Sequence, residues 1–128
     1  MVNTSARYKL TSAILACFLY GGWAYFINSG AGALEGLTSG VAQGIASFIL
    51  TLFIVMVVTK LYHMINAGSR LKVIIPAGLT AVGVAIILSL IHWLIGTDHI
   101  LPTILPSIIV ASVFCVVTGL KLAQMTGD

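Results

Sequence analysis

The chain has 128 residues, of which 59% are hydrophobic and 7% are charged. Soluble globular proteins contain about a quarter charged residues, so this composition excludes a soluble domain and is typical of integral membrane proteins. The formal net charge is +3, but the basic residues stand singly beside apolar runs, which argues against a nucleic-acid partner. At roughly 20 residues per span, the length predicts an all-α, multi-pass bundle of four transmembrane helices with short loops, in one membrane domain over residues 1–128.

The first predicted span covers residues 8–28. Arg7 and Lys9 precede an apolar run, as in a signal peptide, but the run continues through bulky aromatic residues, so we interpret it as a retained span. Aromatic rings suited to the membrane–water interface stand near its far end: Tyr20, Trp23 and Tyr25. The next stretch, residues 29–37, holds three glycines and the acidic Glu35, and predicts a flexible loop in water.

The second predicted span covers residues 38–62. Its core, residues 48–58, is almost entirely Phe, Ile, Leu and Val. Each of these residues contributes roughly −0.3 to −0.6 kcal/mol near a bilayer centre, so insertion of the core is favourable by about 3–5 kcal/mol. A short basic loop, residues 63–72, follows.

Two further spans complete the predicted bundle. The third covers residues 73–96 and carries Pro76 in its expected first turn, where a missing N–H costs little. A short loop with Asp98 separates it from the fourth span, residues 102–124, in which Pro102 suits the first turn.

The basic residues predict the orientation through the positive-inside rule. With a cytoplasmic N-terminus, every basic residue falls on the cytoplasmic side, whereas Glu35 and Asp98 fall on the opposite side. The basic residues are Arg7, Lys9, Lys60, Arg70, Lys72 and Lys121. We therefore predict a multi-pass protein of a bacterial inner membrane with cytoplasmic N- and C-termini.

Each span carries small residues mostly spaced by four, which places them on one helix face. Small side chains let helix backbones approach closely, and such packing drives helix association within lipid. The residues expected to pack helices together are Cys17, Gly21, Gly40, Gly44, Ser47, Ala81, Ala85, Ala111, Cys115 and Gly119. Ile54 is expected on a lipid-facing side of the second span. These rows predict a homo-oligomer or a larger membrane complex, and a permeation path lined by small residues is the alternative.

Polar side chains gather at one depth, near the outer ends of the first three spans. The ligand-binding hypothesis comprises Tyr20, Trp23, Gln43, Ser89 and His92. His92 is the one titratable side chain well inside a predicted boundary, and a buried ionisable group is a candidate for function by default. The alternative is a structural, neutral histidine bonded to Gln43, Ser89 or a backbone carbonyl.

Catalytic and metal motifs are missing from this sequence. His92 and His99 lie seven residues apart across a glycine with few further ligands nearby, so we expect no metal site, and no cofactor is indicated. Cys17 and Cys115 fall within predicted spans and are interpreted as packing residues. The working hypothesis is a transporter-like protein, or one that handles lipid or a small solute, with an outer-leaflet polar pocket and membrane lipid as a partner. A non-catalytic accessory subunit of a larger membrane complex is the alternative, and a small membrane enzyme is a third option.

Overall fold

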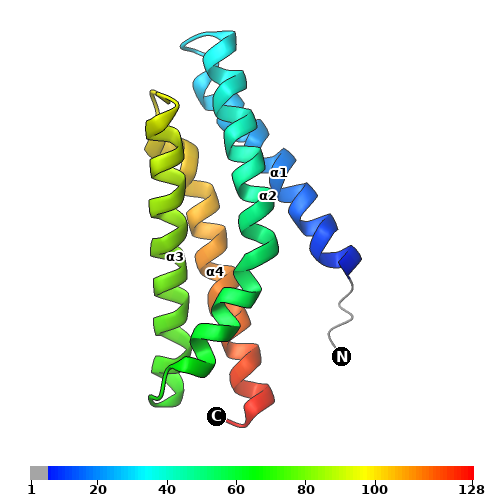
Figure 1. Ribbon diagram of the computed structural model, residues 1–128, viewed down its shortest axis with the longest axis vertical. Coiled ribbons are helices and arrows are strands. Elements are labelled where there is room, and N and C mark those ends of the chain that lie inside the picture. Colours follow the sequence, from blue (N-terminus) through cyan, green and yellow to red (C-terminus); the bar gives the residue numbers. More distant parts are fainter. Residues whose placement is uncertain (1–5) are drawn as a thin grey trace.

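The computed structural model describes residues 6–128, which form four helices and no strand (Figure 1). The helices are α1 (Ala6–Asn28), α2 (Ala33–Met64), α3 (Ser69–Leu94) and α4 (Ile100–Thr126). Each is long and apolar enough to cross a membrane. The prediction of an all-α, four-helix membrane bundle is confirmed.

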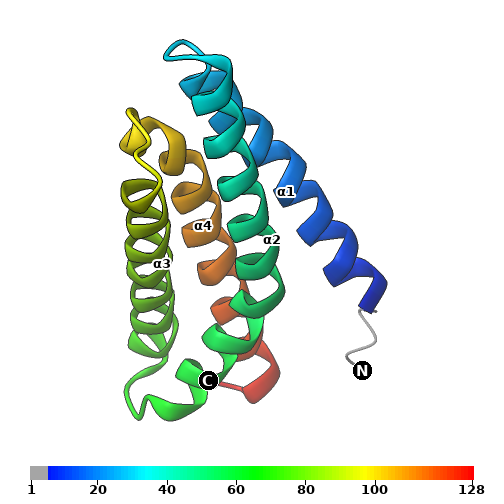
Figure 2. The same cartoon turned by 45° about the horizontal axis from the view of Figure 1, so that its top comes forward.

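Successive helices run in opposite directions, so the connections gather at two ends of the bundle (Figures 1 and 2). The loops 29–32 and 95–99 lie at one end, called here the loop end. The turn 65–68, the start of α1 and the end of α4 lie toward the other, called here the terminal end. Helix α1 packs mainly on α2 and leans away from the other helices toward its own start (Figure 2).

Glycines bring the backbones of α1 and α2 into direct contact. A Cβ atom at Gly21 would lie 2.9 Å from the carbonyl oxygen of Gly40 and 3.2 Å from the Cα of Gly44. A Cβ atom at Gly44 would in turn lie 3.0 Å from the carbonyl oxygen of Cys17. Backbone atoms at these distances leave no room for a side chain. This glycine seam, Gly21, Gly40 and Gly44, therefore sets the spacing of α1 and α2.

Helix α2 begins at Ala33, so the prediction that residues 33–37 belong to a loop is wrong. Gly36 extends the row of the seam by one turn, and a Cβ atom there would lie 2.9 Å from the Cα of Ser29. Glu35 stands in the first turn of the helix, where a carboxylate interacts favourably with the helix dipole. Close packing and a well-placed charge together explain the earlier start.

Helix α3 begins at Ser69, which places Pro76 inside the helix rather than in its first turn as predicted. The proline is buried. Its missing N–H leaves the carbonyl of Lys72 without the usual helical donor. The helix nevertheless continues to Leu94.

The apolar interior lies between α2, α3 and α4 in two clusters. One is built on Ala46, Val84, Leu88 and Ile104, and the other on Ile54, Val58, Ala77 and Cys115. Ile54 is buried, so its predicted lipid-facing position is wrong. The reason is that the buried row of α2 passes from Ser47 to Ile54, Val58 and Tyr62 as the helix leaves α1 and packs on α3 and α4.

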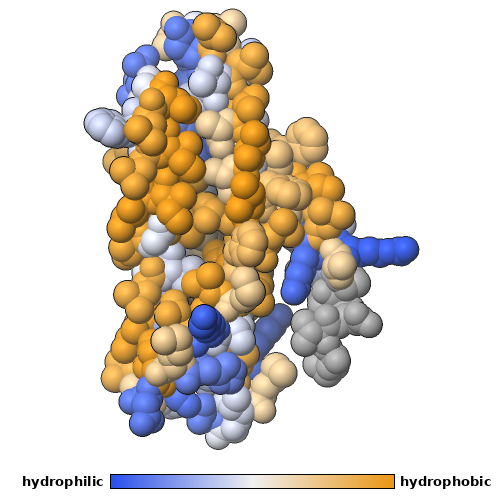
Figure 3. Space-filling model, viewed as in Figure 1, coloured by the Kyte–Doolittle hydropathy of each residue, from blue (hydrophilic) through white to orange (hydrophobic). Residues whose placement is uncertain are grey.

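Large apolar side chains cover the outside of the bundle. Phe18 is 75% exposed and Leu94 is 74% exposed, and Figure 3 shows apolar side chains over most of one face, with polar ones gathered toward the two ends. Water would disfavour such a surface, whereas lipid tails match it. The chain is an integral, multi-pass membrane protein.

Candidate functional site

A hydrogen bond between Gln43 of α2 and His92 of α3 lies at the centre of the polar interior. Both side chains are fully buried. The Nε2 of His92 lies 2.7 Å from the Oε1 of Gln43, and its Nδ1 lies 2.8 Å from the Oγ1 of Thr97. The amide oxygen only accepts, so Nε2 carries a proton and donates. In the neutral imidazole Nδ1 then accepts from the Thr97 hydroxyl.

The amide nitrogen of Gln43 extends these bonds to α4. It donates to the Oγ of Ser107 at 2.7 Å and to the Oγ of Ser47 at 3.3 Å. At the other end, the Oγ of Ser39 lies 3.1 Å from the Oγ1 of Thr97. We call the whole set the polar chain: Ser39, Thr97, His92, Gln43, Ser47 and Ser107. It joins three helices and the 95–99 loop through bonds that use both amide hydrogens of Gln43.

Local geometry places the members of this chain. Ser39, Gln43 and Ser47 are spaced by four on α2 and share one face. Gly96, after the end of α3, has a φ of +72°, a left-handed conformation that glycine adopts without strain. The polypeptide backbone therefore turns back at Gly96, and the N–H of Thr97 donates to the carbonyl of His92 at 2.9 Å. The turn carries the Thr97 hydroxyl to the imidazole.

A small polar cavity of about 200 Å³ lies at the loop end of the polar chain. Ser39 and Thr97 line it, together with the carboxylate-bearing residues Glu35 and Asp98. We call it the loop-end cavity. Water entering there meets the hydroxyl groups that lead to His92.

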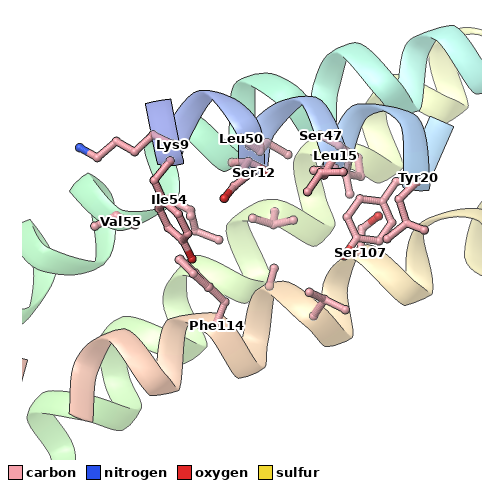
Figure 4. Close-up of a pocket in the computed structure, with 18 residues that line it drawn as sticks. Lys9, Ser12, Leu15, Tyr20, Ser47, Leu50, Ile54, Val55, Ser107 and Phe114 are labelled. Carbon is pink, nitrogen blue, oxygen red and sulfur yellow. The ribbon is translucent and has the colours of Figure 1, made fainter. Parts of the chain in front are cut away.

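A larger cavity of about 360 Å³ lies on the opposite side of Gln43, between α1, α2 and α4, with α3 at its base (Figure 4). We call it the lateral groove. Its walls are mostly apolar and include Leu15, Leu19, Leu50, Ile54, Val84, Leu88, Val110 and Phe114. Ser47, Ser107 and Tyr20 lie together at its inner end, whereas Lys9 lies at its mouth (Figure 4). The polar chain therefore runs from one cavity to the other.

The chemistry of Gln43 limits what the polar chain does. An amide nitrogen donates and an amide oxygen accepts, and a proton does not pass between them without an unfavourable tautomer. The polar chain therefore does not conduct protons from the loop-end cavity to the lateral groove. The role of the polar chain is to orient hydrogen-bonding groups at the lateral groove.

Side-chain hydrogen bonds attach helix α1 to α4 near the loop end. The indole N–H of Trp23 donates to the carbonyl oxygen of Pro102 at 2.9 Å. That carbonyl lacks its helical donor because the residue four positions later is Pro106, which has no N–H. The amide of Asn28 donates to the Thr103 hydroxyl at 2.8 Å, which ties the same helices together.

The five residues of the ligand-binding hypothesis are distributed over different environments. Tyr20 lines the lateral groove, and Gln43 and His92 bond directly to each other, which fills the space between them. Trp23 is 39% exposed and binds the α4 backbone. Ser89 is half-buried beside His92 on α3, but both imidazole nitrogens are occupied by Gln43 and Thr97.

Several residues of the site were not singled out as ligands from the sequence: Asn28, Ser39, Thr97, Thr103 and Ser107. Ser39 lies four residues before Gln43 on α2, and Ser107 lies four residues before Ala111 on α4. Each spacing is a weak signal. Asn28 at the end of an apolar span is a stronger one, since an amide there needs a partner.

The predicted packing residues lie in two kinds of position. Cys17 packs on Gly44, Cys115 is fully buried, and a Cβ atom at Gly119 would lie 3.0 Å from a methyl carbon of Val73. Ala111 packs against both apolar clusters. By contrast, Ala81 and Ala85 are half-exposed, because the buried row of α3 lies one residue away, on Thr80, Val84, Leu88 and His92.

No group of three His, Cys, Asp or Glu residues within 6–128 is placed to hold a metal ion. Comparison with protein-family models, curated proteins and solved structures finds no match for this chain.

Proposed function

We propose that this protein binds a membrane-borne amphiphile in the lateral groove, as part of lipid or small-solute handling. The observation that carries the proposal is the sideways opening of the groove. Leu15 and Leu19 of α1 and Val110 of α4 line it and are 64%, 65% and 52% exposed, on surfaces that face lipid in a membrane. A cavity of about 360 Å³ with apolar walls and a few polar groups is of the size and character of ligand sites.

The proposal differs in place from the pocket expected between Tyr20, Trp23, Gln43 and His92. The groove lies on the terminal-end side of Gln43, where α1 leaves α4. We also propose that the termini are cytoplasmic, since the basic residues Arg7, Lys9, Lys60, Arg70, Lys72 and Lys121 stand toward the terminal end of their helices. In that orientation the groove opens into the cytoplasmic leaflet.

A matched pair of variants tests the groove. Val110→Trp fills it, whereas Val113→Trp adds the same bulk to a side chain that is 60% exposed and does not line it. Native mass spectrometry of protein extracted in mild detergent should show bound lipid for the wild type and Val113→Trp, and much less for Val110→Trp. Equal lipid retention in all three would contradict the proposal. A copurifying second polypeptide in place of lipid would favour the accessory-subunit alternative.

Labelling tests the orientation. Single cysteines at Gly30 and Gly68, in a background with Cys17 and Cys115 replaced by serine, occupy open positions in which a Cβ atom meets nothing within 4 Å. A membrane-impermeant thiol reagent added to intact cells should label position 30 and leave position 68 unlabelled. The reverse result would place the termini outside.

A further inference from the structure

The inner end of the lateral groove presents hydroxyl groups whose hydrogens have no acceptor on the protein. Ser47 and Ser107 are 5% and 7% exposed, and each accepts a hydrogen bond from Gln43. Within the described residues neither hydroxyl donates to a protein atom. Buried donors without acceptors are costly, so their presence beside a cavity indicates a ligand that accepts.

Several other helical hydroxyls donate within their own helix, whereas the buried Thr80 hydroxyl, which does not line the groove, has no partner among the described residues. Five hydroxyls donate to the carbonyl four residues earlier, the usual solution for a serine or threonine in a membrane helix: Thr38, Thr103, Ser112, Thr118 and Thr126. Ser47 and Ser107 make no such bond. Their hydrogens are therefore available to the groove, which both residues line.

The orientation of Gln43 maintains this arrangement. Because His92 donates to the amide oxygen, the amide nitrogen has to face Ser47 and Ser107. The nitrogen occupies one of the two lone pairs of each hydroxyl and leaves its hydrogen unused, so each hydroxyl is able to donate to the groove. The inner end is thus a donor site built from two helices.

Charge selects the kind of acceptor. The groove lining contains one charged residue, Lys9, which lies at the mouth with its ammonium end pointing away from the cavity (Figure 4). At the inner end the lining groups are the neutral Tyr20, Ser47 and Ser107. An anion buried there would lack a counter-charge and lose its hydration, whereas a neutral carbonyl oxygen would not.

We propose that the groove selects a neutral amphiphile whose polar end bears a carbonyl-type oxygen, bound inward against Ser47 and Ser107, with its apolar chain leaving between α1 and α4. This inference rests on the proposed function. The ligand class includes esters, ketones and quinone-like head groups, all of which accept without carrying charge. The apolar chain passes Leu15 of α1 and Phe114 of α4, which line the groove and are exposed on the outside of the bundle.

The test uses three photoreactive probes with the same hexadecyl chain and a diazirine beside the head group. The heads are a methyl ester, an ionised carboxylate and a trimethylammonium group, so that one is a neutral acceptor, one an anionic acceptor and one no acceptor. Crosslinking to the protein in phosphatidylcholine nanodiscs, followed by peptide mapping, reports both occupancy and the position of the head. The ester should label most strongly, with adducts on peptides that contain Tyr20 or Ser107.

Serine variants supply the second measurement. Ser47→Ala and Ser107→Ala should each reduce ester labelling by about three- to tenfold, the effect of one neutral hydrogen bond. Ser112→Ala is the matched control, because that hydroxyl donates to the Ile108 carbonyl and lies outside the groove lining. It should leave labelling unchanged. A melting curve for each variant establishes that the bundle remains folded.

The outcomes separate this inference from the function on which it rests. If Val110→Trp leaves labelling by every probe unchanged, no probe occupies the groove and the proposed function fails. If Val110→Trp blocks labelling but the three heads label equally, or the serine variants behave like Ser112→Ala, only the selection of a carbonyl group is wrong. Strongest labelling by the carboxylate, with adducts near Lys9, would show an anionic ligand bound head-outward and overturn the inference.

Discussion

The loop-end and terminal halves of the bundle are held together by different forces. In the loop-end half, hydrogen bonds from Trp23 and Asn28 join α1 to α4, a bond from Gln43 joins α2 to α4, and a bond from His92 to Gln43 joins α3 to α2. In the terminal half, α2, α3 and α4 pack on apolar side chains, and α1 stands apart. At the terminal end, hydrogen bonds join Tyr62 of α2 and Lys72 of α3 to Asp128.

This difference explains where the lateral groove forms. Polar groups buried within a membrane have no water as an alternative hydrogen-bond partner. Their hydrogen bonds to one another therefore fix the relative positions of the helices that carry them. Where such bonds are present, α1 is attached on two sides, to α2 and to α4. Toward the terminal end α1 packs mainly on α2, with Ala13 and Ala16 buried, and the lateral groove opens between α1 and α4.

The largest expected effect comes from the glycine seam. Gly21→Leu should lower the free energy of unfolding by about 3 kcal/mol or more, because its Cβ atom would lie 2.9 Å from the carbonyl oxygen of Gly40 and the two backbones must separate. The adjacent Gly22→Leu meets nothing within 4 Å and should change stability little. Thermal unfolding in detergent measures both. Equal destabilisation would mean that the seam does not hold α1.

Removing the imidazole of His92 tests the polar chain of the loop-end half. His92→Ala should cost about 2–3 kcal/mol, since it orphans the buried oxygen of Gln43 and leaves a cavity. His92→Gln keeps a donor and an acceptor and should recover much of that loss. His99→Ala, whose side chain is exposed and forms no cap bond, is the control. Tolerance of His92→Ala at the level of His99→Ala would contradict a structural role for the polar chain.

A smaller effect is expected at the attachment of α1 to α4. Trp23→Phe removes the donor to the Pro102 carbonyl and should cost about 1 kcal/mol. In a Pro106→Ala background the helix supplies its own N–H to that carbonyl, so the same change should cost less. A double-mutant cycle on unfolding free energies gives the coupling. Strict additivity would show that the indole does not replace the missing helical bond.

The smallest effect is expected at the terminal end. The Lys72 ammonium and the Tyr62 hydroxyl, both 2.9 Å from the Asp128 carboxylate, lower the pKa of that group to about 2. The ordinary value is 3.8, so the bond stabilises the fold fully above about pH 4 and ceases to do so as the pH falls through 2.

Asp128→Asn should therefore lower the melting temperature slightly at pH 7, and this effect should shrink as the pH approaches 2. The exposed position and screening by water keep the effect small. Asp98→Asn at the loop end, which forms no ion pair within residues 6–128, is the control. A loss that persists unchanged at pH 2 would mean that the carboxylate charge is not its source.

The sequence by itself determined the all-α class and the four spans, because insertion depends on the summed transfer free energy of each apolar run. It also placed Gln43 and His92 at one depth and identified two packing rows, Cys17 with Gly21 in the first span and Gly40 with Gly44 in the second, since residues four apart share one helix face.

Only the tertiary structure decided which side chains meet. It paired Trp23 with the carbonyl that Pro106 leaves free, joined Thr97 to His92 and turned the buried row of α3 onto Val84 and Leu88 instead of Ala81 and Ala85. The physical reason is that lipid is as apolar as the bundle interior, so hydrophobic patterning does not fix the rotation or tilt of a helix in the membrane. Close packing and buried hydrogen bonds fix both, and these depend on residues distant in the chain.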